Sequence, residues 1–232
     1  MTDVTYQQRR DALETYFDRT AAEAWAKLTS DAPVSGVRAK VRAGRDTIRD
    51  TILGWLPADL SDEAVLDAGC GAGQLAFAMA ERGASVEAVD LASTLLDIAA
   101  ERAPAHVRER VQFRAGDMLD PHGAPVERVV AMDSIIHYRP DDMADMIAGL
   151  AERAREQVIF TFAPRTPMLT ALWLVGKLFP KSDRSPAIVP VSEAGLRRRI
   201  AAHPGLQGWR VARTLRVDRF FYISQAMELV RE

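Results

Sequence analysis

The chain has 232 residues, of which 48% are apolar and 27% are charged, and this is the composition of a globular protein with a sizeable core. Its 30 lysines and arginines nearly match its 32 aspartates and glutamates, so the net charge of -2 gives no general attraction for nucleic acid. The single cysteine, Cys70, excludes an internal disulfide and a zinc site made from several cysteines. Neither a signal peptide nor an apolar run of membrane-spanning length is recognisable, so we expect a cytoplasmic protein.

Two amphipathic helices are predicted before the first strand. Apolar residues recur at helical spacing in two groups, Leu13, Phe17, Ala21, Ala24 and Leu28, followed by Val37, Val41, Ile48, Ile52 and Trp55. The second helix also carries a basic stripe, made of Arg38, Arg42, Arg45 and Arg49. This stripe is either a solvated helix face or a surface that contacts an anion. We expect residues 1–57 to form a helical cap on the main domain, residues 58–232.

From residue 64 onward, short apolar runs alternate with helical patterns, which is typical of a parallel α/β sheet. The predicted strands cover residues 64–69, 85–90, 111–115, 128–132 and 157–162, and the predicted helices cover residues 74–82, 94–102, 141–155 and 192–203. Residues 209–217 and 219–230 are predicted to form a closing hairpin, with Val217, Asp218 and Arg219 making the reversal.

An insertion at about 165–191 separates the fifth strand from the last predicted helix. Its apolar segment, PMLTALWLVGKLFP, is too short to span a bilayer. We interpret this segment as a core helix, a wall of an apolar ligand pocket, or a segment that lies on a membrane surface.

The stretch VLDAGCGAGQLAFAMAERG predicts a strand, a glycine turn and a helix, with Gly69, Gly71 and Gly73 in the turn. Backbone amides at such a helix start can face a bound nucleotide-like ligand. The dinucleotide-binding fingerprint is not met, because Gln74 stands where its third glycine belongs. A carboxylate at Asp67, two residues before the first glycine, suits a ligand with an ammonium group better than a pyrophosphate.

This turn resembles motif I of the class I S-adenosylmethionine-dependent methyltransferases. The resemblance implies a Rossmann-like, doubly wound and mostly parallel sheet of seven strands. Asp90 ends the second strand, where a carboxylate can accept both ribose hydroxyls, and Asp117 follows the third strand, where the family contacts the adenine amino group. Leu91 and Met118, which follow these two aspartates directly, are included in the predicted cofactor site.

Other segments resemble magnesium protoporphyrin IX methyltransferases of (bacterio)chlorophyll biosynthesis, from TYFDRTAAEAW near the start through MDSIIHY, FTFAPRTPMLT and GKLFP to DRFFY. One departure is that no tyrosine follows Trp25 closely, since Ala26, Lys27, Leu28 and Thr29 stand there. The resemblance implies methyl transfer from S-adenosylmethionine to a propionate of magnesium protoporphyrin IX. Magnesium then belongs to the substrate, and we expect no metal site in the chain itself.

His137 is the predicted orienting group for the reacting carboxylate, because it follows the fourth strand at the edge where α/β active sites open. A histidine satisfied at a helix start is the alternative. Asp133 would either orient His137 or contact the methionine part of the cofactor. Apolar walls for the macrocycle are expected from Tyr16, Phe17, Trp25 and Trp173, and either the basic stripe or Arg165 would meet the second propionate.

Two other functions remain open at this point. A methyltransferase acting on a phenolic quinone precursor would share the fold and the cofactor motifs, and would need His137 as a general base. A non-catalytic porphyrin carrier would share the pocket. The resemblance also leaves open a contact with the porphyrin-binding subunit of magnesium chelatase and a peripheral contact with the photosynthetic membrane.

Overall fold

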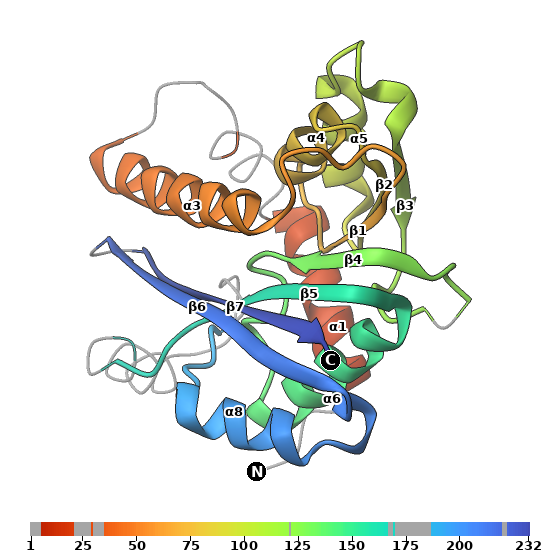
Figure 1. The fold of residues 1–232 in the computed structure, drawn as a ribbon. Coiled ribbons are helices and arrows are strands. Elements are labelled where there is room, and N and C mark those ends of the chain that lie inside the picture. Colours follow the sequence, from red (N-terminus) through yellow and green to blue (C-terminus); the bar gives the residue numbers. More distant parts are fainter. Residues whose placement is uncertain are drawn as a thin grey trace.

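A seven-stranded sheet with the order β3-β2-β1-β4-β5-β7-β6 runs through the described part of the chain (Figure 1). The computed structural model describes residues 6–20, 29, 35–120, 122–166, 169, 187–219 and 222–232. The strands are β1 (Ala64–Ala68), β2 (Ser85–Asp90), β3 (Val111–Ala115), β4 (Val126–Ala131), β5 (Ala154–Phe162), β6 (Trp209–Arg219) and β7 (Tyr222–Arg231). Strands β1 to β5 pair in parallel, and β7 is antiparallel to both β5 and β6. The predicted fold class is therefore confirmed.

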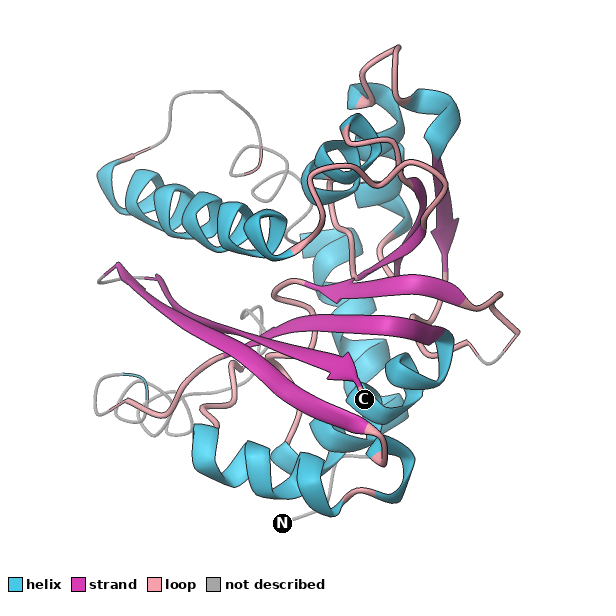
Figure 2. Cartoon of the chain, viewed as in Figure 1, coloured by secondary structure: helices cyan, strands magenta, loops and turns pink. Residues whose placement is uncertain are grey.

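Helices cover both faces of this sheet (Figure 2). On one face, α3 (Gly36–Trp55) and α4 (Gln74–Glu81) pack on side chains such as Val65 and Ile159. The other face packs on α1 (Tyr6–Thr15), α6 (Pro140–Arg153) and α8 (Glu193–Ala202) through side chains such as Leu66 and Phe160. Burial on both faces explains why the central strands are nearly continuous apolar runs. The remaining short elements are α5 (Ser93–Arg102), η2 (Arg108–Arg110) and η3 (Pro204–Leu206).

The N-terminal helices differ in part from the sequence prediction. Helix α1 is followed by one π-helical turn, η1 (Tyr16–Thr20), and the rest of the first predicted helix lies outside the described residues. Helix α3 forms as predicted, and Ile48 and Ile52 are fully buried against the sheet. Val37, however, is 49% exposed, and the other residues of the first turn of α3, 36–40, are exposed as well.

The predicted reversal at residues 217–219 is wrong. Strand β6 continues to Arg219, which pairs with Tyr222, so residues 217–219 belong to the strand. Val217 is buried and pairs with Ser224, which requires an extended backbone rather than a turn at this position. Helix α6 likewise ends two residues earlier than predicted, because Ala154 is already buried in β5 opposite Val126.

A polar cluster fixes the end of α3 to the C-terminal hairpin. The buried Glu228 of β7 accepts hydrogen bonds from Gln157 and from Arg213 of β6. The side chains of Gln157 and Arg213 also donate to the carbonyl oxygen of Trp55, at 3.2 and 3.1 Å. Because Trp55 is the last residue of α3, these bonds set the position of the helix over β6 and β7. In the described part of the chain, no helix is both long enough and apolar enough to cross a membrane.

Candidate active site

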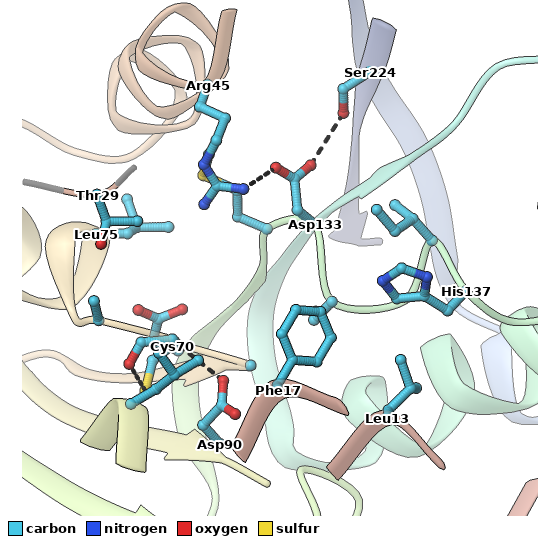
Figure 3. Close-up of a pocket in the computed structure, with 18 of the residues that line it drawn as sticks. Leu13, Phe17, Thr29, Arg45, Cys70, Leu75, Asp90, Asp133, His137 and Ser224 are labelled. Carbon is cyan, nitrogen blue, oxygen red and sulfur yellow. Dashed lines mark hydrogen bonds and ion pairs between the residues drawn. The ribbon is translucent and has the colours of Figure 1, made fainter. Parts of the chain in front are cut away.

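A cavity of about 340 Å³ opens where β1, β2 and β4 end (Figure 3). Carboxyl ends of parallel strands at the point where the strand order reverses are the usual ligand site of this architecture. Its wall on the strand side includes Asp67, Gly69, Gly71, Asp90, Leu91, Met118, Asp133 and His137. Residues distant in sequence complete the wall, among them Leu13, Phe17, Val41, Arg45, Arg49, Ile188, Tyr222 and Ser224.

The glycines of the turn have separate structural reasons. A Cβ on Gly69 would stand 2.3 Å from the Cβ of Ser134, so the turn needs a glycine where it passes the chain that follows β4. A Cβ on Gly71 would meet no atom within 4 Å, which means that the turn faces open space there. Both residues have positive φ, at 83° and 53°, a region that other residues enter at a cost. Gly71 thus leaves room for a ligand to approach the backbone.

Two carboxylates lie beside this turn, the buried Asp67 and the partly exposed Asp90. Asp90 accepts hydrogen bonds from the backbone N–H of Gly71 at 2.8 Å and of Ala92 at 2.9 Å, which fixes both of its oxygens. Burial raises the pKa of Asp90. Burial, together with the charge of Asp90, raises the pKa of Asp67 to about 7, although a backbone hydrogen bond from Ala76 acts in the opposite direction.

The residues at this end of the cavity fit S-adenosylmethionine. Oδ2 of Asp67 is fully buried and has no hydrogen-bond partner among the described residues. A buried carboxylate oxygen without a donor is costly, and an ammonium group would supply one. Each oxygen of Asp90 is already fixed by one backbone N–H and can accept a further hydrogen bond, so the carboxylate can bind the two hydroxyls of a ribose. The ammonium and the ribose of the cofactor therefore match the two aspartates.

Two predicted cofactor residues lie elsewhere. Gly73 caps α4 with a φ of 79°, and it is not among the described residues that line the cavity. Asp117 is also absent from that part of the lining, although Met118 beside it is present. The carboxylate of Asp117 accepts hydrogen bonds from the hydroxyl of Tyr6 at 2.9 Å and from Arg10 at 3.3 Å, both on α1. Its predicted contact with adenine stays a prediction.

Asp133 is the centre of a hydrogen-bond network at the other end of the cavity (Figure 3). Its carboxylate receives Nη1 of Arg45 at 2.6 Å, the hydroxyl of Tyr222 at 2.9 Å and the hydroxyl of Ser224 at 3.3 Å. Its own N–H donates to Thr161 at 2.7 Å. The residue has a φ of 56°, a conformation that side chains rarely adopt, and the four contacts hold it there. Its two predicted roles are untested by this geometry.

His137 lies in the segment between β4 and α6, and its side chain faces the cavity. It is 6% exposed, and its neighbours Ile135 and Tyr138 are buried in the core, so both sides of the segment are anchored. The ring of Phe17 lies 6.1 Å from the imidazole, centroid to centroid. Figure 3 shows Phe17 between Asp90 and His137. The structure therefore brings His137 into the same cavity as the cofactor residues.

Comparison with known proteins decides the family. Residues 131–231 match the family described as Magnesium-protoporphyrin IX methyltransferase C-terminus, and residues 65–157 match the Methyltransferase domain family. Magnesium-protoporphyrin O-methyltransferase of Rhodobacter capsulatus is 45% identical over 224 residues, which are 96% of this chain and 97% of that protein. The chain belongs to the magnesium-protoporphyrin O-methyltransferase family.

Other relatives agree with this assignment. Magnesium protoporphyrin IX methyltransferase from Synechocystis PCC 6803, in its crystal structure with bound S-adenosylhomocysteine (SAH), superimposes with a TM-score of 0.83 at 30% identity. The superposition covers 96% of this chain and 100% of that one. The ubiquinone biosynthesis O-methyltransferase of Paracidovorax citrulli is 31% identical, but over 131 residues that cover only 53% of this chain. The likeness to the quinone enzyme is thus partial, whereas the likeness to this family spans the chain.

Of the four predicted substrate residues, the structure describes only Tyr16 and Arg165. Tyr16 is half-buried against Phe17, and Arg165 is exposed. Neither is among the described lining residues, whereas Phe17 is. Trp25 and Trp173 lie outside the described residues. Their roles toward the macrocycle stay predictions.

Sequence reasoning missed Tyr222 and Ser224. Tyr222 closes the RFFY segment, which had been singled out only as a family signature. Burial and the nearby Asp133 raise the pKa of the Tyr222 hydroxyl, so this hydroxyl stays protonated and donates a hydrogen bond. The basic stripe is divided by the structure, because Arg38 is exposed while Arg45 and Arg49 line the cavity.

Proposed function

We propose that this chain transfers the methyl group of S-adenosylmethionine to a propionate carboxylate of magnesium protoporphyrin IX and so forms the monomethyl ester. The observation that carries this proposal is the 45% identity to a magnesium-protoporphyrin O-methyltransferase over almost the whole of both chains. The cavity supports it, because the buried Asp67 and the partly exposed Asp90 fit the cofactor, and His137 faces the same space. Magnesium enters as part of the substrate.

The chemistry requires positioning rather than proton removal. A propionic acid has an unperturbed pKa near that of glutamate, about 4.3, so the nucleophile is already an anion at neutral pH. S-adenosylmethionine supplies a methyl group on a sulfonium. The chain must hold a carboxylate oxygen in line with that methyl group, at roughly 3 to 3.5 Å, and keep water away from the oxygen.

His137 is the residue proposed to orient the reacting carboxylate, through a hydrogen bond from its imidazole. His137→Asn keeps a donor and should retain appreciable activity, whereas His137→Ala should lose more. A hydrogen bond worth about 1 to 3 kcal/mol in the transition state corresponds to a loss of about 5- to 150-fold in rate. SAH release in single-turnover experiments measures both variants.

Base catalysis on a phenol makes the opposite prediction for the same variants. A phenol has a pKa of about 10, so His137 would have to accept its proton, and neither alanine nor asparagine can do so. Equal and near-complete inactivation of both variants, with a wild-type rate that rises through the histidine pKa, would overturn the orienting role.

Substrate identity is tested with the purified chain, S-adenosylmethionine and a panel of magnesium protoporphyrin IX, metal-free protoporphyrin IX and a phenolic quinone precursor. The expected product is magnesium protoporphyrin IX with the mass of one added methylene group. Equal or better turnover of the phenol contradicts the proposal. Porphyrin binding without any SAH release would instead identify a carrier.

Two contacts with other cell components are also proposed. We infer that the chain meets the porphyrin-binding subunit of magnesium chelatase and the surface of the photosynthetic membrane, since an apolar tetrapyrrole must be received and passed on. Apart from Leu169, the apolar segment 168–179 on which the membrane contact rests lies outside the described residues. Flotation with anionic vesicles should weaken in a folded Leu172→Gln, Trp173→Gln double variant, and unchanged flotation contradicts the membrane contact.

The contact with the chelatase subunit is tested by sedimentation of a mixture of the two proteins. A sedimentation coefficient that does not change in the mixture contradicts this contact.

Three further assignments are proposals of the same kind. Residues 1–57 act as a cap, the insertion at about 165–191 contributes to substrate binding, and Tyr16, Trp25, Arg165 and Trp173 contact the macrocycle. Porphyrin titration of single alanine variants measures these contacts, and an affinity that stays at the wild-type value removes the residue concerned from the substrate site.

A further inference from the structure

The end of the cavity opposite the cofactor aspartates is built around a buried ion pair. Arg45 reaches the cavity from α3, and its side chain is 17% exposed. The side chain of Asp133, 2.6 Å away, is 7% exposed. Figure 3 shows Arg45 and Asp133 on the side of the cavity away from Asp90 and Cys70. The two charged ends are therefore separate.

The surrounding structure fixes this guanidinium in place. Tyr222 and Ser224, at the start of β7, donate to the same carboxylate as Arg45, and the hydroxyl of Thr161 is a fourth donor, so four side chains share the charge of Asp133. Directly before Arg45, a Cβ on Gly44 would stand 2.5 Å from Cδ1 of Tyr222, so α3 packs on this ring as closely as a glycine allows. Replacing a buried ion pair with apolar residues often costs nothing in stability, so we take the role of this pair to be geometric. The arrangement is that of a preformed receptor.

The chemistry of such a receptor suits a carboxylate. A guanidinium offers planar paired donors that match the two oxygens of a carboxylate. Arg49 lies one turn further along the same helix face and lines the same cavity, so a second cation is nearby. The proposed substrate has two propionates, only one of which is methylated.

The charge change in the reaction indicates which propionate Arg45 binds. Methyl transfer joins an anionic oxygen to a cationic sulfonium, the S–C bond breaks, and both charges vanish as the ester and SAH form. A guanidinium on the reacting oxygen would stabilise the charged ground state more than the less charged transition state, and would slow the step. The same guanidinium on the other carboxylate holds the substrate without this penalty, since that charge does not change.

We propose that Arg45 binds the propionate that is not methylated, and that Asp133 is a positioning residue that fixes the guanidinium of Arg45. This inference rests on the proposed function, because it needs a substrate with two carboxylates. It assigns to Asp133 a role other than the two that the sequence suggested. It also explains single methylation, because a porphyrin already esterified at this position loses the contact that holds it.

The test is a binding cycle that pairs a change in the protein with a change in the ligand. The ligands are magnesium protoporphyrin IX and its monomethyl ester carrying the methyl group on the non-reacting propionate, titrated by tetrapyrrole fluorescence in the presence of SAH. Wild-type protein should bind the ester about 10- to 150-fold more weakly, the range of one charge-assisted hydrogen-bonded contact. Arg45→Met should bind both ligands equally. Loss of affinity by the same factor for both, or retention of the wild-type ratio, overturns the proposal.

Turnover adds a second readout. In Arg45→Met the KM for magnesium protoporphyrin IX should rise while kcat changes little, because the guanidinium is away from the reacting oxygen. A large fall in kcat at unchanged KM would place Arg45 on the reacting carboxylate and overturn the assignment. The titration involves no turnover, so a wild-type protein that forms no ester refutes the proposed function while the binding cycle still reports on Arg45.

Variants of Asp133, of Arg45 and of a distant arginine complete the experiment. Asp133→Asn should reduce the discrimination between the two ligands with SAH affinity unchanged, which a general structural defect would not do. Arg45→Lys keeps the cation and loses the planar donors, so it should show intermediate discrimination and replaces Arg45→Met if that variant does not fold. Arg155→Met is the matched control, since it removes an arginine from an ion pair with Glu127 at the opposite end of the strands.

Discussion

The two ends of the cavity are built in different ways. The cofactor end is made of two neighbouring strands and the turns that follow them, which supply Asp67, Gly69, Gly71 and Asp90. Backbone N–H groups fix the carboxylate of Asp90. The other end takes Arg45 from a helix before the sheet, Asp133 from the end of β4, and Tyr222 from the C-terminal hairpin. The first end is encoded locally, whereas the second exists only once distant segments have packed together.

This difference predicts different sensitivities to mutation. Changes in the glycine turn should alter the backbone and the cofactor affinity, while changes near Arg45 should alter substrate affinity and leave the cofactor bound. The comparison fails if variants at either end affect both ligands equally.

The largest effect is expected for Gly69→Ala. The added Cβ would stand 2.3 Å from Ser134 at a φ of 83°, so strain and overlap together should cost about 3 kcal/mol or more of unfolding free energy. Gly71→Ala is the matched control, because its Cβ meets nothing and only the φ penalty of about 1 to 2 kcal/mol remains. Urea unfolding measures both, and equal losses would show that the approach to Ser134 does not require the first glycine.

Asp90→Ala should weaken SAH binding by about 1.5 to 3 kcal/mol, the value of hydrogen bonds to a charged acceptor. Porphyrin affinity should not change, because Asp90 is at the cofactor end. Calorimetric titration with each ligand gives the two numbers. Wild-type affinity for SAH in this variant would place the ribose elsewhere.

Cofactor binding should depend on pH through Asp67. Burial raises the pKa of this carboxylic acid to about 7, so below pH 7 the ionised form that pairs with an ammonium becomes tenfold rarer per pH unit. SAH affinity should therefore fall by about tenfold per unit as the pH drops below 7 and level off above it. The cofactor-free chain should show the opposite trend, gaining stability as the pH falls from 7 toward the ordinary aspartate value, because the protonated form is the one that tolerates burial. If SAH affinity in Asp67→Asn depends on pH as steeply as in the wild type, another group causes the effect.

The smallest effect is expected for Gly44→Ala. A Cβ there would overlap the ring of Tyr222, and the ring or the helix must shift at a cost of about 1 kcal/mol. Porphyrin affinity should fall severalfold and SAH affinity should not. Gly54→Ala is the control on the same helix, since its Cβ would meet nothing and alanine is the better helix former. A loss of SAH affinity in Gly44→Ala alone would contradict the separation of the two ends.

Most of the sheet could be predicted from the sequence, as could the position of Asp67, Gly69, Gly71 and Asp90 at one edge of it, because both depend on local patterns. Each strand, the glycine turn and Asp90 can be recognised from the residues next to it in the sequence. The partners of Asp133 could not be read in this way, since Tyr222 is 89 positions away in sequence. The predicted reversal at residues 217–219 is wrong, because pairing with β7 keeps this segment extended. The orientation of Asp117 toward α1 likewise depends on a tertiary contact with Tyr6.

Strand β7 has a consequence for the order in which the molecule folds. It is synthesised after β6 yet lies between β5 and β6. Pairing with β6 is local, and hairpins of this kind form within microseconds, whereas pairing with β5 joins residues as distant as Gln157 and Val230. We therefore expect the hairpin to form early and to dock on β5 late. Tyr222 and Ser224 reach Asp133 only with that docking, so a refolding chain should recover SAH binding before it recovers porphyrin binding.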